Sequence, residues 1–274
     1  MTPTLAQIDT ISDLLLEVAD AEILPHFRRM RSADLRTKSS AVDFVTDADE
    51  AAERVLTAHL RRMFPDAVII GEEAVFADAN VLRALGGADF AITLDPIDGT
   101  RNFVAGIGVF AVMVAFLVKG EPVANVIFDP LVRDCVIALK GQGAWIRHAD
   151  GSRERLHVAA PRPVHEMEGC GLWAHMEAAQ RPAFAQRLTR FAATAGYRCS
   201  AHECRVVANG QYDFAIFHKL TPWDHAPGVI LQREAGGHVA HLDGAAYDPV
   251  RKDGGLLLAP DEASWLAIRR MLQA

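Results

Sequence analysis

The amino-acid sequence predicts an α+β first half joined to an α/β second half, with the change of pattern near residue 150. In the first half, two segments with helical spacing of apolar residues precede a series of short apolar runs. Gly and Pro punctuate these runs, which is typical of an antiparallel sheet. From about Gly151, strand and helix patterns alternate, which favours a more parallel sheet covered by helices. We therefore expect residues 1–150 and residues 151–274 to form two coupled halves.

Two amphipathic helices are predicted in the first half. Apolar residues at helical spacing run from Leu5 to Val18, with acidic residues among them and no basic stretch in front. This segment is expected to be a helix rather than a signal peptide, which needs a basic region before its apolar core. The second helix is predicted from Asp47 to about Phe64, with Thr46 as its N-cap and Asp49 in its first turn.

The remaining elements are predicted from the same periodicities. Strands are expected in the first half at residues 67–70, 90–94, 109–118, 123–128 and 135–139. In the second half, strands are expected at 156–159, 168–172, 214–217, 238–241 and 256–259, and helices at 175–195, 202–210, 224–235 and 261–272.

The composition is that of an ordinary globular protein. Half of the 274 residues are hydrophobic and 23% are charged, with a formal net charge of −7 and no dense run of Lys or Arg. Nucleic acid and anionic membranes are therefore not expected as partners. The longest uncharged apolar run, residues 109–118, is too short for a membrane span of about 20 residues. Four cysteines without a C-x-x-C pair fit a reducing, cytoplasmic location.

Acidic residues stand at the ends of three apolar segments. “VIIGEEAVF” places Glu72 and Glu73 after a strand. “ITLDPIDGT” places Asp95 and Asp98 after another strand, and “TPWDHAPG” places Asp224 before a helix. One such cluster is common on a surface, but three in one chain favour a site, because buried like charges need a cation to neutralise them. No His or Cys cluster with zinc spacing accompanies them, so these oxygen ligands favour Mg²⁺ or Mn²⁺.

The residues that follow Asp98 are suited to binding an anion. Gly99 lets the backbone approach a ligand closely, and the N–H groups of Gly99 and Thr100 would open a short helix, where negative charge is favoured. Magnesium sites in proteins commonly combine carboxylates with substrate phosphate oxygens. A metal and a phosphate together indicate phosphoryl chemistry.

Four motifs in this order resemble those of the inositol monophosphatase family of Mg²⁺-dependent, lithium-sensitive phosphatases. They are “KSSAVDFVTDADE” (38–50), “GEE” (71–73), “DPIDGTRNF” (95–103) and “WDHAPG” (223–228), with “EAGG” (234–237) behind the last. The resemblance runs through most of the chain. It implies a layered αβαβα sandwich of the sugar-phosphatase type, a homodimer, and hydrolysis of a small phosphate monoester.

The resemblance also implies a set of metal ligands, residue by residue. Glu72, Asp95 and the main-chain carbonyl of Ile97 would hold one Mg²⁺. Asp95, Asp98 and Asp224 would hold a second ion, so that Asp95 bridges the pair. A third, more loosely held ion would contact the “GEE” acids through water. The first half would thus carry most metal ligands and the phosphate turn, and the second half would carry Asp224 and the leaving-group pocket.

The catalytic residues are implied by the same family pattern. Asp49 and Thr100 would polarise the attacking water for in-line attack on phosphorus. Glu72 would also take part in catalysis, because it would hold one of the metal ions. Gly99 and Thr100 would also contact the phosphate, and Lys38 matches a family lysine near the phosphate and the metals.

Two departures from the family pattern leave the substrate open. The segment that packs against the inositol ring is represented here by “YRCSAHECR”, which supplies Ser200 and, further on, Glu203. A Glu that grips ring hydroxyls is replaced by Phe217, which predicts an apolar wall and broad selectivity among alcohols. Glu203 could recognise a hydroxyl or an amine, or cap its helix. Arg101 could contact phosphate or pair with a neighbouring acid.

Several functions therefore remain possible at this point. Inositol 1-phosphate or a similar polyol phosphate is the first substrate hypothesis, histidinol phosphate is the second, and nucleotide or sugar phosphates are alternatives within the superfamily. A rival mechanism through an aspartyl-phosphate is suggested by “DAD” at residues 47–49, although no clear strand precedes it and no Thr follows. The non-enzymatic rival is a regulatory or RNA-associated factor, and the intact set of metal-ligand acids argues against it.

Overall fold

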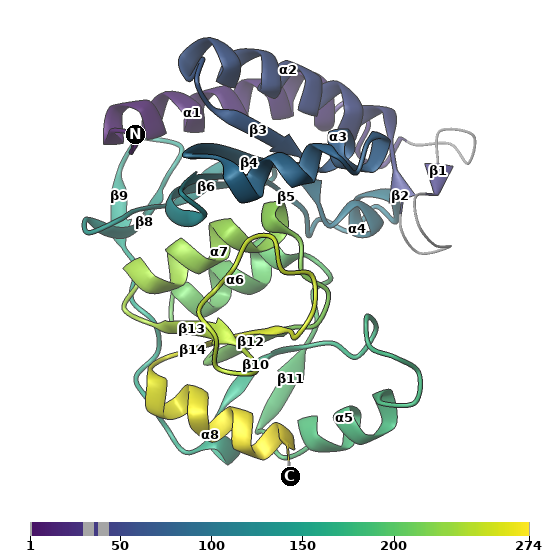
Figure 1. Ribbon diagram of the computed structural model, residues 1–274, viewed down its shortest axis with the longest axis vertical. Coiled ribbons are helices and arrows are strands. Elements are labelled where there is room, and N and C mark those ends of the chain that lie inside the picture. Colours follow the sequence, from purple (N-terminus) through teal and green to yellow (C-terminus); the bar gives the residue numbers. More distant parts are fainter. Residues whose placement is uncertain (1, 30–35, 38–43, 274) are drawn as a thin grey trace.

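The chain forms five layers, helix–sheet–helix–sheet–helix, in the computed structural model (Figure 1). The structure describes residues 2–29, 36–37 and 44–273, so the predicted phosphate-site residue Lys38 lies outside the described residues. One pair of helices covers the outer face of a seven-stranded sheet, a second pair separates this sheet from a five-stranded sheet, and a third covers the far side (Figure 1). This is the layered αβαβα sandwich that the sequence predicts.

The first helical layer confirms the two amphipathic helices. Its elements are α1 (Leu5–Val18), the π-helical turn η1 (Ala19–Ile23) and α2 (Asp47–Met63). Each α-helix begins with a capping box, between Thr4 and Gln7 at α1 and between Thr46 and Asp49 at α2. The buried apolar residues of both helices belong to one core cluster with those of the seven-stranded sheet.

The seven-stranded sheet has the strand order β3-β4-β5-β6-β7-β8-β9. Its strands are β3 (Val68–Gly71), β4 (Phe90–Asp98), β5 (Ala111–Val118), β6 (Glu121–Asp129), β7 (Asp134–Leu139), β8 (Gly143–Arg147) and β9 (Arg153–Arg155). Neighbouring strands are antiparallel, as predicted, except for the parallel pair β3 and β4. All nine residues of β4 are buried, because α2 covers one face of the sheet and α7 (Pro222–Glu234) covers the other.

The strand expected at residues 156–159 is wrong. The last strand of the sheet, β9, ends at Arg155. Beyond it, the N–H of Leu156 donates to Ala144, whereas the N–H of Val158 donates to Ala235 in a different layer. Because its hydrogen bonds go to two separate elements, this apolar segment forms a connecting loop and does not pair as a strand.

Short elements join the main layers of the fold. They are β1 (Arg36–Thr37), which pairs with β2 (Phe44–Val45), α3 (Glu72–Ala77), η3 (Val81–Gly87), α4 (Thr100–Val104) and η4 (Val164–Glu166). The helix α4 is the one predicted after the Gly99-Thr100 turn.

The five-stranded sheet has the order β11-β10-β12-β14-β13. Its strands are β10 (Glu168–Gly171), β11 (Ala193–Ala195), β12 (Phe214–Phe217), β13 (His238–His241) and β14 (Leu256–Ala259). Only β10 pairs in parallel, with β11 and β12, while β14 is antiparallel to both β12 and β13. The parallel half-sheet expected from strand–helix alternation is therefore only partly correct. The reason is that β13 and β14 are joined by a loop, without the crossover helix that parallel strands need.

The helix expected at residues 175–195 is also wrong. It is replaced by the shorter α5 (Arg181–Leu188) and the edge strand β11. Pro182 stands in the first turn of α5, where a proline is tolerated, and residues before it form turns. The guanidinium of Arg181 donates to the carbonyls of Met176 and Ala174, which holds those turns against the helix start.

The two middle helices, α6 (Ser200–Ala208) and α7, pack closely against each other, and α8 (Glu262–Gln273) joins α5 on the outer side. Gly228 of α7 permits this approach, because a Cβ built there would lie 2.2 Å from Sγ of the buried Cys204 on α6. Within the described ranges, no helix has the length and apolar composition needed to cross a membrane.

Gly228→Ala is expected to destabilise the protein by about 1 to 3 kcal/mol, the usual scale for overpacking a filled core. The added methyl group must displace the side chain of Cys204, which is buried between the two helices. Denaturant unfolding measures the effect. Adding Cys204→Ala to Gly228→Ala removes the clashing sulfur and should recover part of the lost free energy of unfolding. Equal stability of the single and the double variant would show that α6 and α7 separate easily.

Candidate active site and its carboxylate cluster

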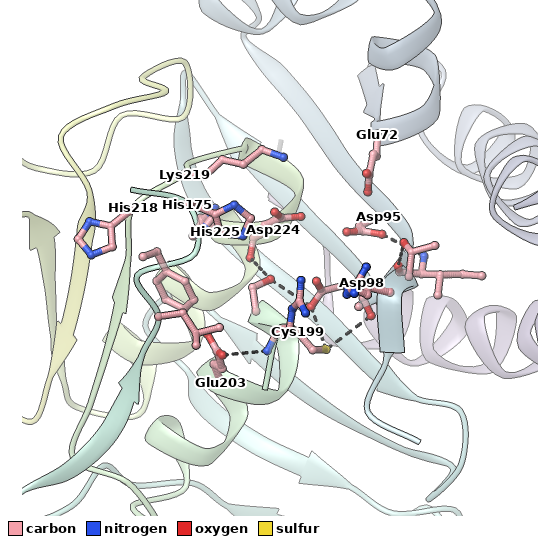
Figure 2. A pocket seen from close by; sticks show the side chains of 18 of the residues that line it. Glu72, Asp95, Asp98, His175, Cys199, Glu203, His218, Lys219, Asp224 and His225 are labelled. Carbon is pink, nitrogen blue, oxygen red and sulfur yellow. Dashed lines mark hydrogen bonds between the residues drawn. The ribbon is translucent and has the colours of Figure 1, made fainter. Parts of the chain in front are cut away.

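A cavity of about 180 Å³ lies where the ends of β4 and β12 meet α3, α4, α6 and α7 (Figure 2). It brings together nearly all residues that the sequence predicts as site residues. Those that line it are Glu72, Asp95, Ile97, Asp98, Gly99, Thr100, Arg101, Ser200, Glu203, Phe217 and Asp224. Asp49 does not line the cavity and stands behind Thr100.

Three carboxylates form the centre of this cavity. One oxygen each of Glu72, Asp95 and Asp224 lies within 4.8 Å of the others, and Figure 2 shows the three groups directed toward a common space. Asp95 is only 1% exposed. Burial, together with the charges of Glu72, Asp224 and Asp98, raises the pKa of Asp95 well above its usual range. This donor set fits a hard divalent cation, which prefers oxygen ligands and would offset the repulsion.

Asp98 lies beside this cluster and is tied to another element. Its Oδ2 accepts hydrogen bonds from the N–H of Ala201 at 2.6 Å, the hydroxyl of Ser200 at 3.1 Å and the thiol of Cys199 at 3.1 Å. Burial and the charge of Asp224 raise the pKa of Asp98 to about 7, although these three donors oppose the shift. Asp98 thus anchors the first turn of α6 to the end of β4.

A bulge in β4 explains how two acids three positions apart reach the same cavity. Side chains alternate between the faces of a strand, so Asp95 and Asp98 would point to opposite faces of a regular one. The pairing with β5 shifts between these two residues, and Pro96 stands in the irregular segment. The N–H of Ile97 turns back to donate to Oδ1 of Asp95 at 3.0 Å. The extra residue of the bulge shifts the alternation of side chains by one position, so that both acids point into the cavity.

The turn after β4 requires glycine at position 99. Gly99 has a φ of 86°, and a Cβ there would lie 2.8 Å from the carbonyl oxygen of Val109. The turn places the hydroxyl of Thr100 so that it donates to the carbonyl of Ile97 at 2.9 Å. The same hydroxyl lies 3.4 Å from Oδ1 of the buried Asp49, whose Oδ2 accepts the N–H of Thr46 at 2.9 Å.

Glu53 supports Glu72 from behind, and the motif analysis does not identify it. Its carboxylate accepts the N–H groups of Glu73 and Ala74, each at 2.8 Å, and so fixes the first turn of α3. Gly71 leaves room for this contact, since a Cβ there would lie 2.3 Å from Glu53. A signal was present in the sequence, because Glu53 falls on the buried stripe of α2, where a charged residue needs a partner.

Glu203 lines the cavity and also binds main-chain N–H groups in front of α6. Its Oε1 accepts the N–H groups of Tyr197 at 2.8 Å and Arg198 at 3.3 Å, so it holds the loop in front of α6. Burial is the main cause that raises the pKa of Glu203 to about 7. Phe217 is buried and its ring contacts the ring of His225 edge-on, with centroids 4.8 Å apart.

Several lining residues have no role that the sequence motifs assign. They include Leu172, His175, Arg198, Cys199, Ile216, His218, Lys219 and His225. His218 and His225 line the cavity. His202 does not line it, and its Nε2 lies 3.2 Å from the carbonyl oxygen of Phe110. Isolated histidines carry no spacing signal, so only the tertiary contact identifies those at the site.

The site can now be compared with known proteins. A model of the “Inositol monophosphatase family” matches residues 5–270. The chain belongs to this family. Among solved structures, the “Thermotoga maritima IMPase” superposes with a TM-score of 0.81 at 25% identity, over 98% of this chain and 99% of the other.

Curated relatives of the inositol monophosphatase family carry several names. A “Nus factor SuhB” of Pseudomonas aeruginosa is 32% identical over 80% of this chain and 80% of its own. An “Inositol-1-monophosphatase” of Caulobacter vibrioides is 32% identical over 82% and 86%. A “Histidinol-phosphatase” of Mycobacterium tuberculosis is 34% identical over 85% and 89%. The chain is therefore a phosphoric monoester hydrolase of a metal-dependent family, and its exact substrate is not settled by these names.

Asp95→Asn should raise the melting temperature of the metal-free protein by a few degrees, because it removes a carboxyl group whose ionised form is disfavoured by burial and by its acidic neighbours. The same change should abolish the stabilisation that added Mg²⁺ gives the wild type, and phosphatase activity should fall by several orders of magnitude. Thermal unfolding with and without Mg²⁺ measures both effects. Asp47→Asn, in an exposed acid outside the cavity, is the matched control. Full Mg²⁺ stabilisation of Asp95→Asn would refute a ligand role for Asp95.

Proposed function

We propose that this protein is a Mg²⁺-dependent phosphatase that hydrolyses a small phosphate monoester by direct attack of water. The single observation that carries the proposal is the cluster of Glu72, Asp95 and Asp224, within 4.8 Å of one another, beside the turn at Gly99 and Thr100. Carboxylates and a backbone turn in one small cavity provide for a cation and a phosphate together.

The proposed ligands are those that the family pattern implies. Glu72, Asp95 and the carbonyl of Ile97 would hold one Mg²⁺, and Asp95, Asp98 and Asp224 a second, with a third more loosely held. Bound Mg²⁺ supplies charge neutralisation of the phosphate, a lower pKa for water and stabilisation of the departing alkoxide. The N–H groups of the Gly99 turn would contact the phosphate oxygens from the protein side.

Thr100 and Asp49 form the proposed proton path. The hydroxyl of Thr100 lies within reach of two acceptors, the carbonyl of Ile97 at 2.9 Å and Asp49 Oδ1 at 3.4 Å. As water attacks phosphorus, Oγ1 of Thr100 would accept its proton while the hydroxyl proton of Thr100 passes to Asp49. The capping contact between Asp49 and Thr46 holds the carboxylate in place for this transfer.

The substrate proposed first is inositol 1-phosphate or a similar polyol phosphate, in a homodimeric cytoplasmic enzyme. Histidinol phosphate is the second candidate, supported by the name of the Mycobacterium tuberculosis relative. Nucleotide and sugar phosphates are the remaining candidates of the superfamily.

Two rival hypotheses, another phosphatase mechanism and a non-enzymatic function, are less well supported. An aspartyl-phosphate at residues 47–49 is disfavoured, because Asp47 is exposed on the first turn of α2 and neither Asp47 nor Asp49 lines the cavity. A purely regulatory function is suggested by the “Nus factor SuhB” name of one relative. The carboxylate cluster favours catalysis instead, and the net charge of −7 does not favour nucleic acid as a partner.

Phosphate release from a panel of monoesters, with Mg²⁺ and with a chelator, tests the proposed function. The panel contains inositol 1-phosphate, glycerol 2-phosphate and histidinol phosphate. Mg²⁺-dependent release that Asp95→Asn abolishes and Asp47→Asn retains would support the proposal. The absence of release from every compound, or a trapped phospho-enzyme, would refute it.

Thr100→Ala should lower kcat by roughly 10²-fold, the usual scale for loss of a proton-transfer group, with little change in KM. The reason is that the cavity keeps its carboxylates and turn N–H groups, while Asp49 loses its connection to the cavity. Steady-state kinetics on the best panel substrate measures both constants. A large rise in KM with unchanged kcat would make Thr100 a binding residue only.

Phe217→Glu should raise kcat/KM for inositol 1-phosphate relative to the other two compounds, because it replaces an apolar lining side chain by a hydroxyl acceptor. In the wild type, the three compounds should have kcat/KM values within about 100-fold of one another, or roughly 3 kcal/mol. Phe217→Leu, which keeps the wall apolar, is the control. A wild-type preference above about a thousandfold for one of the three would contradict this prediction.

A further inference from the structure

A second cavity, of about 480 Å³, lies in the outer helical layer between α5 and α8 (Figure 1). Its wall is mostly apolar, and the apolar side chains are those of Met176, Ala179, Ala183, Phe184, Leu242 and Leu272. Small organic molecules commonly bind in concave sites of this size, where an apolar wall carries a few polar groups. The polar groups of this wall therefore decide which kind of molecule it suits.

These polar groups are basic and lack partners. The cavity is lined by Arg187 and Arg269, and none of the described residues that line it is acidic, although the whole chain carries a net charge of −7. Within the described part of the chain, Arg187 makes no hydrogen bond or ion pair. Nε of Arg269 and Nε2 of His218 are buried and have no hydrogen-bond partner among the described residues. Buried polar atoms without a partner are rare, so this wall is suited to an anion.

His218 lines both this cavity and the cavity that contains the carboxylate cluster. Its ring contacts the ring of Phe184 edge-on, with centroids 4.6 Å apart, and lies away from the carboxylate cluster (Figure 2). The connection between β10 and α5 is shared in the same way, because Leu172 lines the carboxylate cavity and Met176 lines the outer one. A molecule bound between α5 and α8 would therefore contact segments that also shape the active site.

We propose that the cavity between α5 and α8 binds a small organic anion with an apolar body, a carboxylate on an apolar chain or ring, and that its binding acts on the active site through His218. The apolar body packs against Phe184 and Leu272, and the anionic group accepts charge-assisted hydrogen bonds from Arg187 and Arg269. The effect on the active site rests on the proposed phosphatase function, whereas the binding does not. Because His218 is neither a proposed metal ligand nor part of the proposed proton path, the bound anion changes KM and not kcat.

Octanoate, octanol, octylammonium and acetate test the binding, since they separate the apolar body from the charge. With a chelator present, the acids of the carboxylate cavity repel an anion, so octanoate binding reports on the cavity between α5 and α8. Isothermal titration calorimetry should give octanoate a dissociation constant at least about tenfold lower than those of the other three compounds. Equal affinity for octanol, or no binding of octanoate, would overturn the proposal.

Two pairs of variants locate the bound octanoate. Arg187→Gln should reduce the ratio of the octanol and octanoate dissociation constants to about threefold or less, whereas Arg190→Gln, an exposed residue outside the lining, should leave it unchanged. Ala183→Trp should fill the cavity and abolish octanoate binding, whereas Ala178→Trp, also at an exposed alanine but outside the lining, should retain it. Full octanoate binding in both Arg187→Gln and Ala183→Trp would contradict the site.

Steady-state kinetics with Mg²⁺ measures the effect on the active site. Saturating octanoate should change the KM of the best panel substrate by at least about twofold with kcat unchanged, and the change should level off as octanoate is increased. Competition at the active site would instead raise KM without limit and would persist in Ala183→Trp. Such competition, or a KM that does not respond, would refute the action through His218.

The two measurements separate failure of the anion site from failure of the proposed function. If no monoester is hydrolysed but octanoate binds and Arg187→Gln weakens it, the phosphatase proposal fails and the anion site stands. If Mg²⁺-dependent hydrolysis occurs and octanoate does not bind, the phosphatase proposal stands and the anion site fails.

Discussion

The contact between Asp98 and the first turn of α6 connects the parts of the molecule on which the cavity depends. One carboxylate oxygen at the end of β4 accepts a main-chain N–H, a hydroxyl and a thiol from residues 199–201, about a hundred positions further along the chain. The hydroxyl of Ser200 also lies 3.1 Å from the carbonyl oxygen of Asp224, which brings α7 to the same junction. The acids of β4 and α7 and the loop that carries Arg198 are therefore held in one rigid arrangement.

Burial of the carboxylates is the main cost of this arrangement, and repulsion between them adds to it. Burial and neighbouring acids raise the pKa values of both Asp95 and Asp98, which means that the folded, metal-free protein disfavours their ionised forms. Backbone N–H groups reduce this cost at two acids beside the cluster. Asp98 accepts an N–H group from the first turn of α6, and Glu53 accepts two from the first turn of α3. A divalent cation held by Glu72, Asp95 and Asp224 would offset this cost, so that stability and metal binding would depend on the same side chains.

Close backbone packing gives the site its small volume. Gly99 allows β4 to turn against Val109, Gly71 allows Glu53 to reach α3, and Gly228 allows α7 to lie on α6. Each of these glycines stands where two elements meet, and two of them are next to an acid that lines the cavity, Gly71 before Glu72 and Gly99 after Asp98. The geometry of the acids is thus set by the packing of the layers around them, and not only by the acids' own contacts.

The sequence by itself determined the local features of this protein. Some features depend on near neighbours, so periodicity and motif spacing predict them. They are the helical stripes and Thr caps of α1 and α2, the buried run of β4, and the acids that follow β3 and end β4. Only the tertiary structure decided the rest. The bulge that brings Asp95 and Asp98 into one cavity depends on pairing with β5, and the antiparallel edge of the second sheet depends on a loop without a crossover helix. The attachment of Glu203 to the Arg198 loop, and the cavity contacts of Arg198, His218 and His225, join elements whose meeting no local pattern encodes, because which faces come together is fixed by packing the whole chain.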